Sequence, residues 1–367
     1  MEKHFGLETA AVLLNGTRAF VSASAAVWPR VRRHFGRTLG QLRRPVSVLG
    51  CLGLASMLFA VPRAAAQTAP PGHRVASLEI KILSTMLANE GFGEWGFAAL
   101  VEVDGRRILF DTGANDDTVQ RNLKALKLDL SDVEVVILSH NHADHTTGLL
   151  PLRRQYVAKS PKALSKMYAG RGIFLPRIAA DGQVDDRMAL IRSEFEATGG
   201  SVEDVAKPTQ ILPGVWLTGP VPRVHPERNW STLGKVRTSG GDVEDTVPED
   251  MTLVFQTEKG LVYLFGCGHA GVINTLEYTR KSIDASPVKA VIGGVHLFAA
   301  TDAQLAWTAS QLKAFGLQQF VGAHCTGIEA VYRIRELAGL TRKTSVVGAV
   351  GASYSLANGI DAVRVAR

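Results

Sequence analysis

The chain has 367 residues, of which 46% are hydrophobic and 20% are charged, a composition that suits a globular protein of one large or two ordinary domains. Its formal net charge of +7 is concentrated in residues 1–66, which hold nine Lys or Arg side chains and two acidic ones. The remaining residues hold 32 basic and 32 acidic side chains, so the folded body gives no electrostatic reason to expect a nucleic-acid partner.

Residues 1–66 are predicted to be an export signal with an upstream leader. Arg43 and Arg44 precede an uncharged run, Val46–Val61, which is shorter than the ~20 residues of a membrane-spanning helix. Small residues up to Ala66 suit cleavage before Gln67. We therefore expect a periplasmic or secreted protein that meets the membrane only through its signal segment. An uncleaved anchor is the alternative, and "RRPVSVLG" loosely resembles a twin-arginine signal, which would imply export in the folded state.

The next residues, 67–76, are expected to form a Pro-containing linker, and residues 77–367 a folded domain. Residues 77–85 have the pattern of a strand. Residues 99–113 predict a hairpin that turns at Asp104-Gly105, since this pair tolerates the positive φ of a tight turn. Residues 115–128 have helical spacing with Asn115 as the expected N-cap. Residues 133–140 then predict a buried strand that runs directly into a group of histidines.

The middle of the chain, at about residues 159–250, changes character. Gly, Pro, Arg and acidic residues are mixed there, and few strands are clear. We interpret this segment as an insertion that caps a site, because long loops inside a compact domain are usually functional.

Regular patterns return after residue 250. A hairpin is predicted over residues 251–268, turning at Lys259-Gly260, and strands and helices then alternate up to a last strand at residues 344–350. Hairpins early in each half and strand–helix alternation late predict an α/β fold in which helices cover sheets.

The histidine cluster is the most informative stretch. "SHNHADHTTG" places His140, His142, Asp144 and His145 within six residues, in a chain with ten histidines. Imidazole nitrogens and carboxylate oxygens are the usual ligands of Zn²⁺ and similar ions. Without a cation, the desolvation of so many polar groups and their mutual repulsion when protonated would make the cluster costly to maintain. The cluster therefore predicts a metal site, with His140 and His142 close enough to share one ion and Asp144 and His145 suited to a second.

This H-x-H-x-D-H spacing resembles the metallo-β-lactamase superfamily. Later stretches, "TGPVPR", "GCGHAGVINTL", "GGVHL" and "GAHCTG", resemble one branch, the 7,8-dihydropterin-6-methyl-4-(β-D-ribofuranosyl)aminobenzene-5′-phosphate synthases, also described as dihydropteroate-synthase-like metallo-hydrolases. The resemblance covers roughly residues 77–350. It implies a four-layer αββα sandwich, here with the inserted cap.

The resemblance also implies a set of ligands. His269 would complete the first group and His324 the second, while Asp111 would brace the site. Many members of the superfamily bridge two metals with an Asp, but here Cys267 or His269 lies about at that position. The bridging ligand and the number of ions therefore stay open.

The implied cofactors are two divalent metal ions, with zinc expected first and manganese or iron as alternatives. Such ions lower the pKa of a shared water and polarise the bond under attack. Asp144 could orient the nucleophile or take its proton as well as bind metal. Oxygen-reducing diiron members carry Glu where this chain has His142, which favours hydrolysis of an ester, phosphoester, lactone or related bond.

The expected partner is a small, anionic substrate. Arg223 could grip an anionic group, Thr326 lies at a predicted helix start that favours an anion, and His296 is a ligand or substrate contact. The alternative is a non-catalytic metal- or ligand-binding protein on the same fold. Cys267 and Cys325 could form one disulfide in an exported protein, or they could belong to the metal site.

Overall fold

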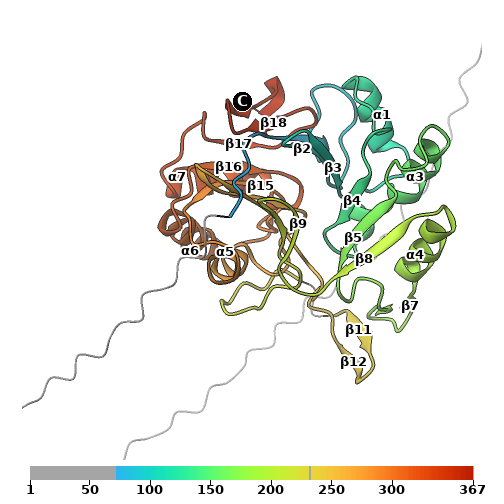
Figure 1. Cartoon of the computed structure of the whole chain (residues 1–367). Helices are drawn as coiled ribbons and strands as arrows, with labels where there is room; N and C mark the ends of the chain where they lie inside the picture. Colours follow the sequence, from blue (N-terminus) through green and yellow to red (C-terminus); the bar gives the residue numbers. More distant parts are fainter. Residues whose placement is uncertain (1–71, 231–232, 367) are drawn as a thin grey trace, which may run out of the picture. The chain divides into compact units, whose positions relative to one another are not determined.

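Two β-sheets face each other at the centre of the computed structural model, which describes residues 72–230 and 233–366 (Figure 1). The expected leader 1–66, its cleavage site and residues 67–71 of the expected linker lie outside the described residues. None of the helices within the described ranges is long and apolar enough to cross a bilayer.

The first sheet has eight strands in the order β19-β18-β1-β2-β3-β4-β5-β8. Its strands are β1 Leu78–Ser84, β2 Ala98–Val103, β3 Arg106–Phe110, β4 Val135–Leu138, β5 Lys166–Gly170, β8 Ser201–Val205, β18 Ser353–Ser355 and β19 Gly359–Asp361. Strands β1, β2 and β3 pair antiparallel, whereas β3, β4, β5 and β8 are parallel. The carboxyl ends of the parallel strands share one edge of the sheet, and the loop with the histidine cluster begins there, directly after β4.

The second sheet has seven strands in the order β17-β16-β15-β14-β13-β10-β9. Its strands are β9 Thr209–Leu212, β10 Val215–Leu217, β13 Leu253–Thr257, β14 Gly260–Phe265, β15 Val288–Gly293, β16 Gln319–Gly322 and β17 Ser345–Val347. Strands β14, β15, β16 and β17 are parallel, so the loops after them also open at one edge. His269, His296 and His324 each follow one of these strands.

Helices cover the outer face of each sheet (Figure 1). The first sheet carries α1 Thr118–Ala125, α3 Leu149–Val157 and α4 Arg187–Ala197, and the second carries α5 Val272–Ser282, α6 Asp302–Ala314 and α7 Ile328–Leu337. One apolar core lies between the sheets and one lies under each helical layer, with Phe110, Leu109 and Tyr263 as buried members of the three. The predicted α/β, four-layer αββα sandwich is therefore confirmed.

Local predictions succeed where turn chemistry is strong. Strands β2 and β3 join at Asp104 and Gly105, which have φ values of 45° and 75°, and strands β13 and β14 join at Gly260, with φ 113°. The N-cap prediction is wrong, because α1 begins after Asp117 and the Asn115 amide donates instead to Glu94.

The segment expected to be an inserted cap, at about 159–250, contributes much more to the sandwich than a cap would. Strands β5, β8, β9 and β10 belong to the two central sheets, and α4 belongs to an outer layer. The part that stands apart is a third sheet of four short strands, with the order β12-β11-β6-β7. These strands are β6 Arg177–Ile178, β7 Val184–Asp185, β11 Lys235–Thr238 and β12 Gly241–Glu244. The cap is therefore narrower than predicted and consists of two separate stretches of the chain.

Candidate metal centre

The histidine loop is held from both sides. Ser139 accepts a backbone hydrogen bond from Met251 at 3.1 Å, and the Asn141 amide donates to Glu249 Oε1 at 3.2 Å. The one-turn helix α2, Ala143–Thr146, follows His142 at once. Its end is fixed to the neighbouring strand because the Thr112 amide donates to the His145 carbonyl at 2.8 Å. The loop is thus tied to its surroundings by backbone hydrogen bonds at several points.

The first group of donors matches the set that the resemblance implied. One ligand atom each of His140, His142 and His269 lies within 4.8 Å of the others. The ring centroids of His140 and His269 are 4.7 Å apart, and those of His142 and His269 are also 4.7 Å apart. Because His269 follows β14 on the second sheet, this group joins the two sheets at their open edge.

The second group is assembled in the same way. Asp144, His145 and His324 also bring one ligand atom each to within 4.8 Å of the others. Asp144 Oδ2 lies 3.2 Å from His324 Nε2, and the two histidine Nε2 atoms are 3.3 Å apart. His324 belongs to a short 3₁₀ turn after β16, where its φ of 48° places it in the left-handed region.

Outer hydrogen bonds determine which ring nitrogens face the centre. His140 Nδ1 donates to Ser139 Oγ at 2.9 Å, and His269 Nδ1 donates to the Asn229 carbonyl. The Nε2 atoms of both rings are then lone-pair acceptors. Both Nε2 atoms are buried and have no hydrogen-bond partner among the described residues. Buried polar atoms of this kind are rare without a ligand, so the donor set fits a bound cation.

Electrostatics agree with this fit. Burial lowers the pKa of His142 to about 4 and, with the neighbouring imidazoles, holds the pKa values of His140 and His269 well below their usual range. Burial alone would raise the pKa of Asp144, but the hydrogen bond from His324 and the nearby imidazoles lower it overall. The first group therefore offers neutral imidazoles and the second a carboxylate, which are the protonation states that divalent metals bind.

Asp111 braces the centre as expected, but from outside it. Its buried carboxylate accepts hydrogen bonds from the Ser139 amide, the Ser139 hydroxyl and His145 Nδ1, each at 2.7 Å. Burial alone would lower the pKa of His145, but the charge and the hydrogen bond of Asp111 raise it to about 9. Asp111 is therefore a positioning residue, because it acts on the ligands His145 and, through Ser139, His140.

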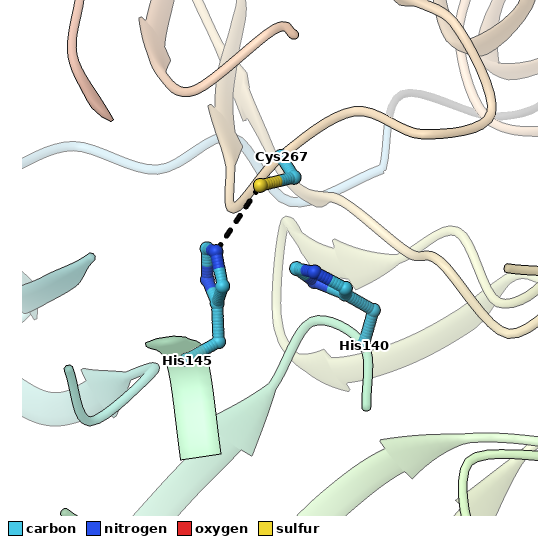
Figure 2. A group of neighbouring side chains, drawn as sticks. All are labelled: His140, His145 and Cys267. Atoms are coloured by element: carbon cyan, nitrogen blue, oxygen red, sulfur yellow. Dashed lines mark hydrogen bonds between the residues drawn. The ribbon is translucent and has the colours of Figure 1, made fainter. Parts of the chain in front are cut away.

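Cys267 lies between the two groups. Its Sγ is 3.1 Å from His145 Nε2, and it is 2% exposed. Figure 2 shows His140, from the loop after β4, and His145, from α2, with the sulfur of Cys267 approaching from the loop after β14. Cys267 and Cys325 are both free thiols, with their Sγ atoms 3.2 Å apart. The structure therefore contains no disulfide between them.

Several supporting residues were not identified from the sequence. Arg187 on α4 donates to the Asn141 carbonyl at 2.6 Å and to Thr146 Oγ1 at 2.7 Å, so it holds both ends of the histidine loop. Glu249 and Asp250 are buried beside the loop, and Asp250 Oδ2 accepts from the Ala270 amide at 2.9 Å. The adjacent acidic pair "ED" at 249–250 was the available signal, but acidic pairs are common on surfaces.

Two of the expected substrate contacts, Thr326 and Arg223, form hydrogen bonds within the protein. Thr326 is fully buried, and its hydroxyl accepts from the Val295 amide and donates to the Gly293 carbonyl, both at 3.1 Å. Arg223 donates to the carbonyls of Thr246 and Val247. The Thr326 hydroxyl and Arg223 Nη2 thus hold loops together, whereas Arg223 Nε is buried and has no hydrogen-bond partner among the described residues.

His296 keeps its position as a site residue. Its ring centroid is 4.6 Å from that of His269, and its Nδ1 is buried without a partner among the described residues. It lines two adjoining cavities. One, of about 450 Å³, also contains His142, His269 and Asp245; the other, of about 310 Å³, contains Arg228 and Trp307. Trp230 lines both cavities, so a ligand at the histidines can extend along this tryptophan.

Comparisons with known proteins agree with this geometry. A family model described as "Metallo-beta-lactamase superfamily" matches residues 96–229. A 7,8-dihydropterin-6-methyl-4-(beta-D-ribofuranosyl)-aminobenzene-5′-phosphate synthase of Methanocaldococcus jannaschii is 29% identical over 271 residues, which cover 70% of this chain and 90% of the synthase. An uncharacterised protein of the same organism is 31% identical over 261 residues, or 70% of this chain and 94% of that protein. The crystal structure of a metal-dependent hydrolase of the beta-lactamase superfamily matches 75% of this chain and 98% of its own, with a TM-score of 0.60 and 24% identity, and so shows the fold.

Proposed function

This chain belongs to the metallo-beta-lactamase superfamily, and on that premise we propose that it is an exported, metal-dependent hydrolase of a small anionic substrate. The family membership expected from the H-x-H-x-D-H spacing is confirmed. The single observation that carries the proposed activity is the convergence of two three-residue donor groups, the first of which lines a cavity through His142 and His269.

The first group, His140, His142 and His269, would hold one divalent ion, and Asp144, His145 and His324 would hold a second. Zinc suits the imidazole-rich set, and manganese or iron remain alternatives for the same donors. When bound, such ions supply a water of lowered pKa and polarise the bond to be cleaved. The side chain of Asp144 is 22% exposed, so its carboxylate can also orient a water or accept a proton from it.

The substrate is proposed to enter along Trp230. The cavity of about 310 Å³ beside the histidines is lined by the indoles of Trp230 and Trp307, so it suits a flat or apolar group. Arg228 lines the same cavity, pairs with Glu244 at 3.0 Å, and is proposed as the cation that attracts an anionic group there. His296 lies where the two cavities meet and can donate a hydrogen bond to a bound ester.

The test begins with the metal content of the purified full chain. It continues with hydrolysis of chromogenic phosphodiesters, phosphate esters, carboxylic esters and lactones, the last two classes each in an anionic and a neutral form. Phosphate esters are included because the name of the synthase relative contains a 5′-phosphate. We expect turnover of at least one class, preference for the anionic form, and loss of turnover in His142→Ala. A matched control is His73→Ala, because His73 is exposed and pairs with Asp104 rather than with the centre.

Metal present without turnover of any class, and with His142→Ala no different from the unchanged chain, would favour a non-catalytic metal- or ligand-binding protein. The proposal that the protein is exported is tested by a separate measurement. Fractionation of cells that express the full chain should place it outside the cytoplasm with a new N-terminus at Gln67, and recovery of the uncleaved chain from the cytoplasm would contradict that part alone.

A further inference from the structure

One side chain at the centre belongs to neither donor group. Cys267 lies two residues after the end of β14, and its Sγ lies close to ligand atoms of both groups. With His140 and His145 it makes one set in which all ligand atoms lie within 4.8 Å of one another. It makes a second such set with His269 and His296, and a third with His324 and Cys325. No other residue in the described ranges appears in three of these sets.

The surroundings of Cys267 suit a ligand better than a packing residue. The side chain is buried, but His145 Nε2 lies 3.1 Å from its sulfur and the centre holds several more polar atoms. A structural cysteine normally packs as a small apolar side chain among other apolar groups. Here the sulfur faces imidazole nitrogens instead (Figure 2). A thiolate is a strong ligand for zinc and is expected wherever a thiol meets other donors of one ion.

The charge balance of the two donor groups also favours a thiolate ligand. The six residues of the two groups are five histidines and one aspartate, and a histidine binds metal as an uncharged imidazole, so two divalent ions would leave these ligands with an excess of positive charge. A buried charge is tolerated when it is paired. A thiolate at the junction of the groups reduces this excess without needing any further chain movement.

Resting on the proposed metal-dependent function, we propose that Cys267 is a seventh ligand, a thiolate shared by the two donor groups. Cys325 is proposed to be a neighbour of this ligand rather than a ligand itself. Its thiol lies 3.2 Å from Cys267 Sγ and also contacts the Cys267 carbonyl at 3.7 Å.

The test replaces the native ions of the full chain with Co²⁺ and records the near-ultraviolet absorption, where a sulfur–cobalt bond gives a charge-transfer band. We expect the band in the unchanged protein and in Cys325→Ala, which removes an equally buried thiol from the neighbouring position. Cys267→Ala should lose the band and bind at least one ion tenfold or more weakly. Cys267→Asp should also lose the band but recover most of the affinity, since it restores an anionic ligand at the same place.

Cobalt bound without a band in the unchanged protein would overturn the proposal, and this measurement requires no variant that might fail to fold. A band that persists in Cys267→Ala and disappears in Cys325→Ala would assign the sulfur ligand to Cys325 instead.

The hydrolase function and the Cys267 ligand are tested by different measurements, so one proposal can fail while the other holds. A band without hydrolysis of any substrate class would contradict the hydrolase function and support the Cys267 ligand. Hydrolysis without a band would support the hydrolase function and contradict the ligand. A chain that binds no cobalt would overturn both.

Discussion

Asp111 shows how one buried carboxylate can organise a metal site that it does not enter. It receives three hydrogen bonds, two from Ser139 and one from His145, and so fixes ligands of both donor groups. In Asp111→Asn the amide keeps the size of the side chain but loses the charge that holds the His145 ring. Partners of this kind typically contribute about 10–100-fold to metal affinity or activity.

We therefore expect Asp111→Asn to weaken the ion held by Asp144, His145 and His324 by about 10–100-fold, and to weaken the other ion less. Competition with a chromogenic chelator measures both affinities. Asp104→Asn is the control, because Asp104 caps the Ser77 amide in a surface turn. Equal affinities in the unchanged protein and Asp111→Asn would show that packing alone orients His145.

A second buried carboxylate predicts a pH effect on stability. Burial raises the pKa of Asp250 to about 7, and its Oδ1 has no hydrogen-bond partner among the described residues. In the unfolded chain an Asp titrates near 3.9. Between about pH 4 and pH 7 the folded state therefore keeps a proton that the unfolded state releases, so the free energy of unfolding falls as pH rises through this window.

Asp250→Asn removes that titration. In metal-free protein, the free energy of unfolding of the unchanged chain should fall relative to that of Asp250→Asn by up to about 1.4 kcal/mol per pH unit in this window. Urea unfolding of both proteins at several pH values between 4 and 8 measures the gap. A gap that stays constant over the whole range would mean that the Asp250 carboxyl titrates normally.

Sequence reasoning at the residue scale succeeded where a residue type has one strong chemistry. The six expected ligands meet in two groups because a cluster of imidazoles is expensive to bury for any other purpose. It was less specific for Arg223 and Thr326, since both can bind a substrate or hold a loop equally well. Only the fold reveals that backbone carbonyls already accept their hydrogen bonds.

At the scale of elements, the end of β14 approaches the histidine loop without a side chain between them. A Cβ placed on Gly266 would lie 2.1 Å from Ser139 Oγ and 2.7 Å from Asp111 Oδ2, well inside contact distance. Gly266→Ala should therefore displace the Ser139–Asp111 pair and destabilise the fold by about 1–3 kcal/mol, as overpacked sites do.

The measurement is denaturant unfolding together with metal affinity, both of which should fall in Gly266→Ala. Gly240→Ala is a suitable control because the nearest atom to its added Cβ, Thr238 Oγ1, is 3.7 Å away and the residue lies in an exposed hairpin. Unchanged affinity in Gly266→Ala would show that the β14 end and the histidine loop can separate without loss of the site.

The segment at about residues 159–250, which was expected to be a cap, was the least predictable part of the chain. Strands β9 and β10 have four and three residues, and β8 alternates only weakly, so none of them shows a clear period. Such short strands are stabilised by pairing with neighbours distant in sequence, as β8 pairs with β5, rather than by their own pattern. The long strands β1 and β14 and the turn at Asp104-Gly105 carry their signal locally, and for this reason they were predicted correctly.

At the scale of the whole molecule, each donor group draws on both sheets. His140 and His142 follow β4 of the first sheet, whereas His269 follows β14 of the second. Asp144 and His145 likewise belong to the first half of the chain, and His324 follows β16. An ion at either group would therefore tie together two halves whose other main contact is the apolar core between the sheets.

This arrangement predicts that metal stabilises the whole fold rather than one loop. An ion at 100 times its dissociation constant adds about 2.7 kcal/mol to the free energy of unfolding. The midpoint of thermal unfolding should therefore fall by several degrees when a chelator is added to the full chain, and should recover on addition of Zn²⁺.

Two variants test whether both sheets hold the ion. His140→Ala, after a strand of one sheet, and His269→Ala, after a strand of the other, should lose the same part of this metal-dependent rise in the midpoint, because both side chains hold the same ion. His73→Ala should keep all of it, because His73 lies on the surface near Asp104. If His269→Ala instead kept the full metal-dependent rise in the unfolding midpoint while His140→Ala lost it, the ion would be held by residues of the first sheet alone. The apolar core would then be what joins the two halves.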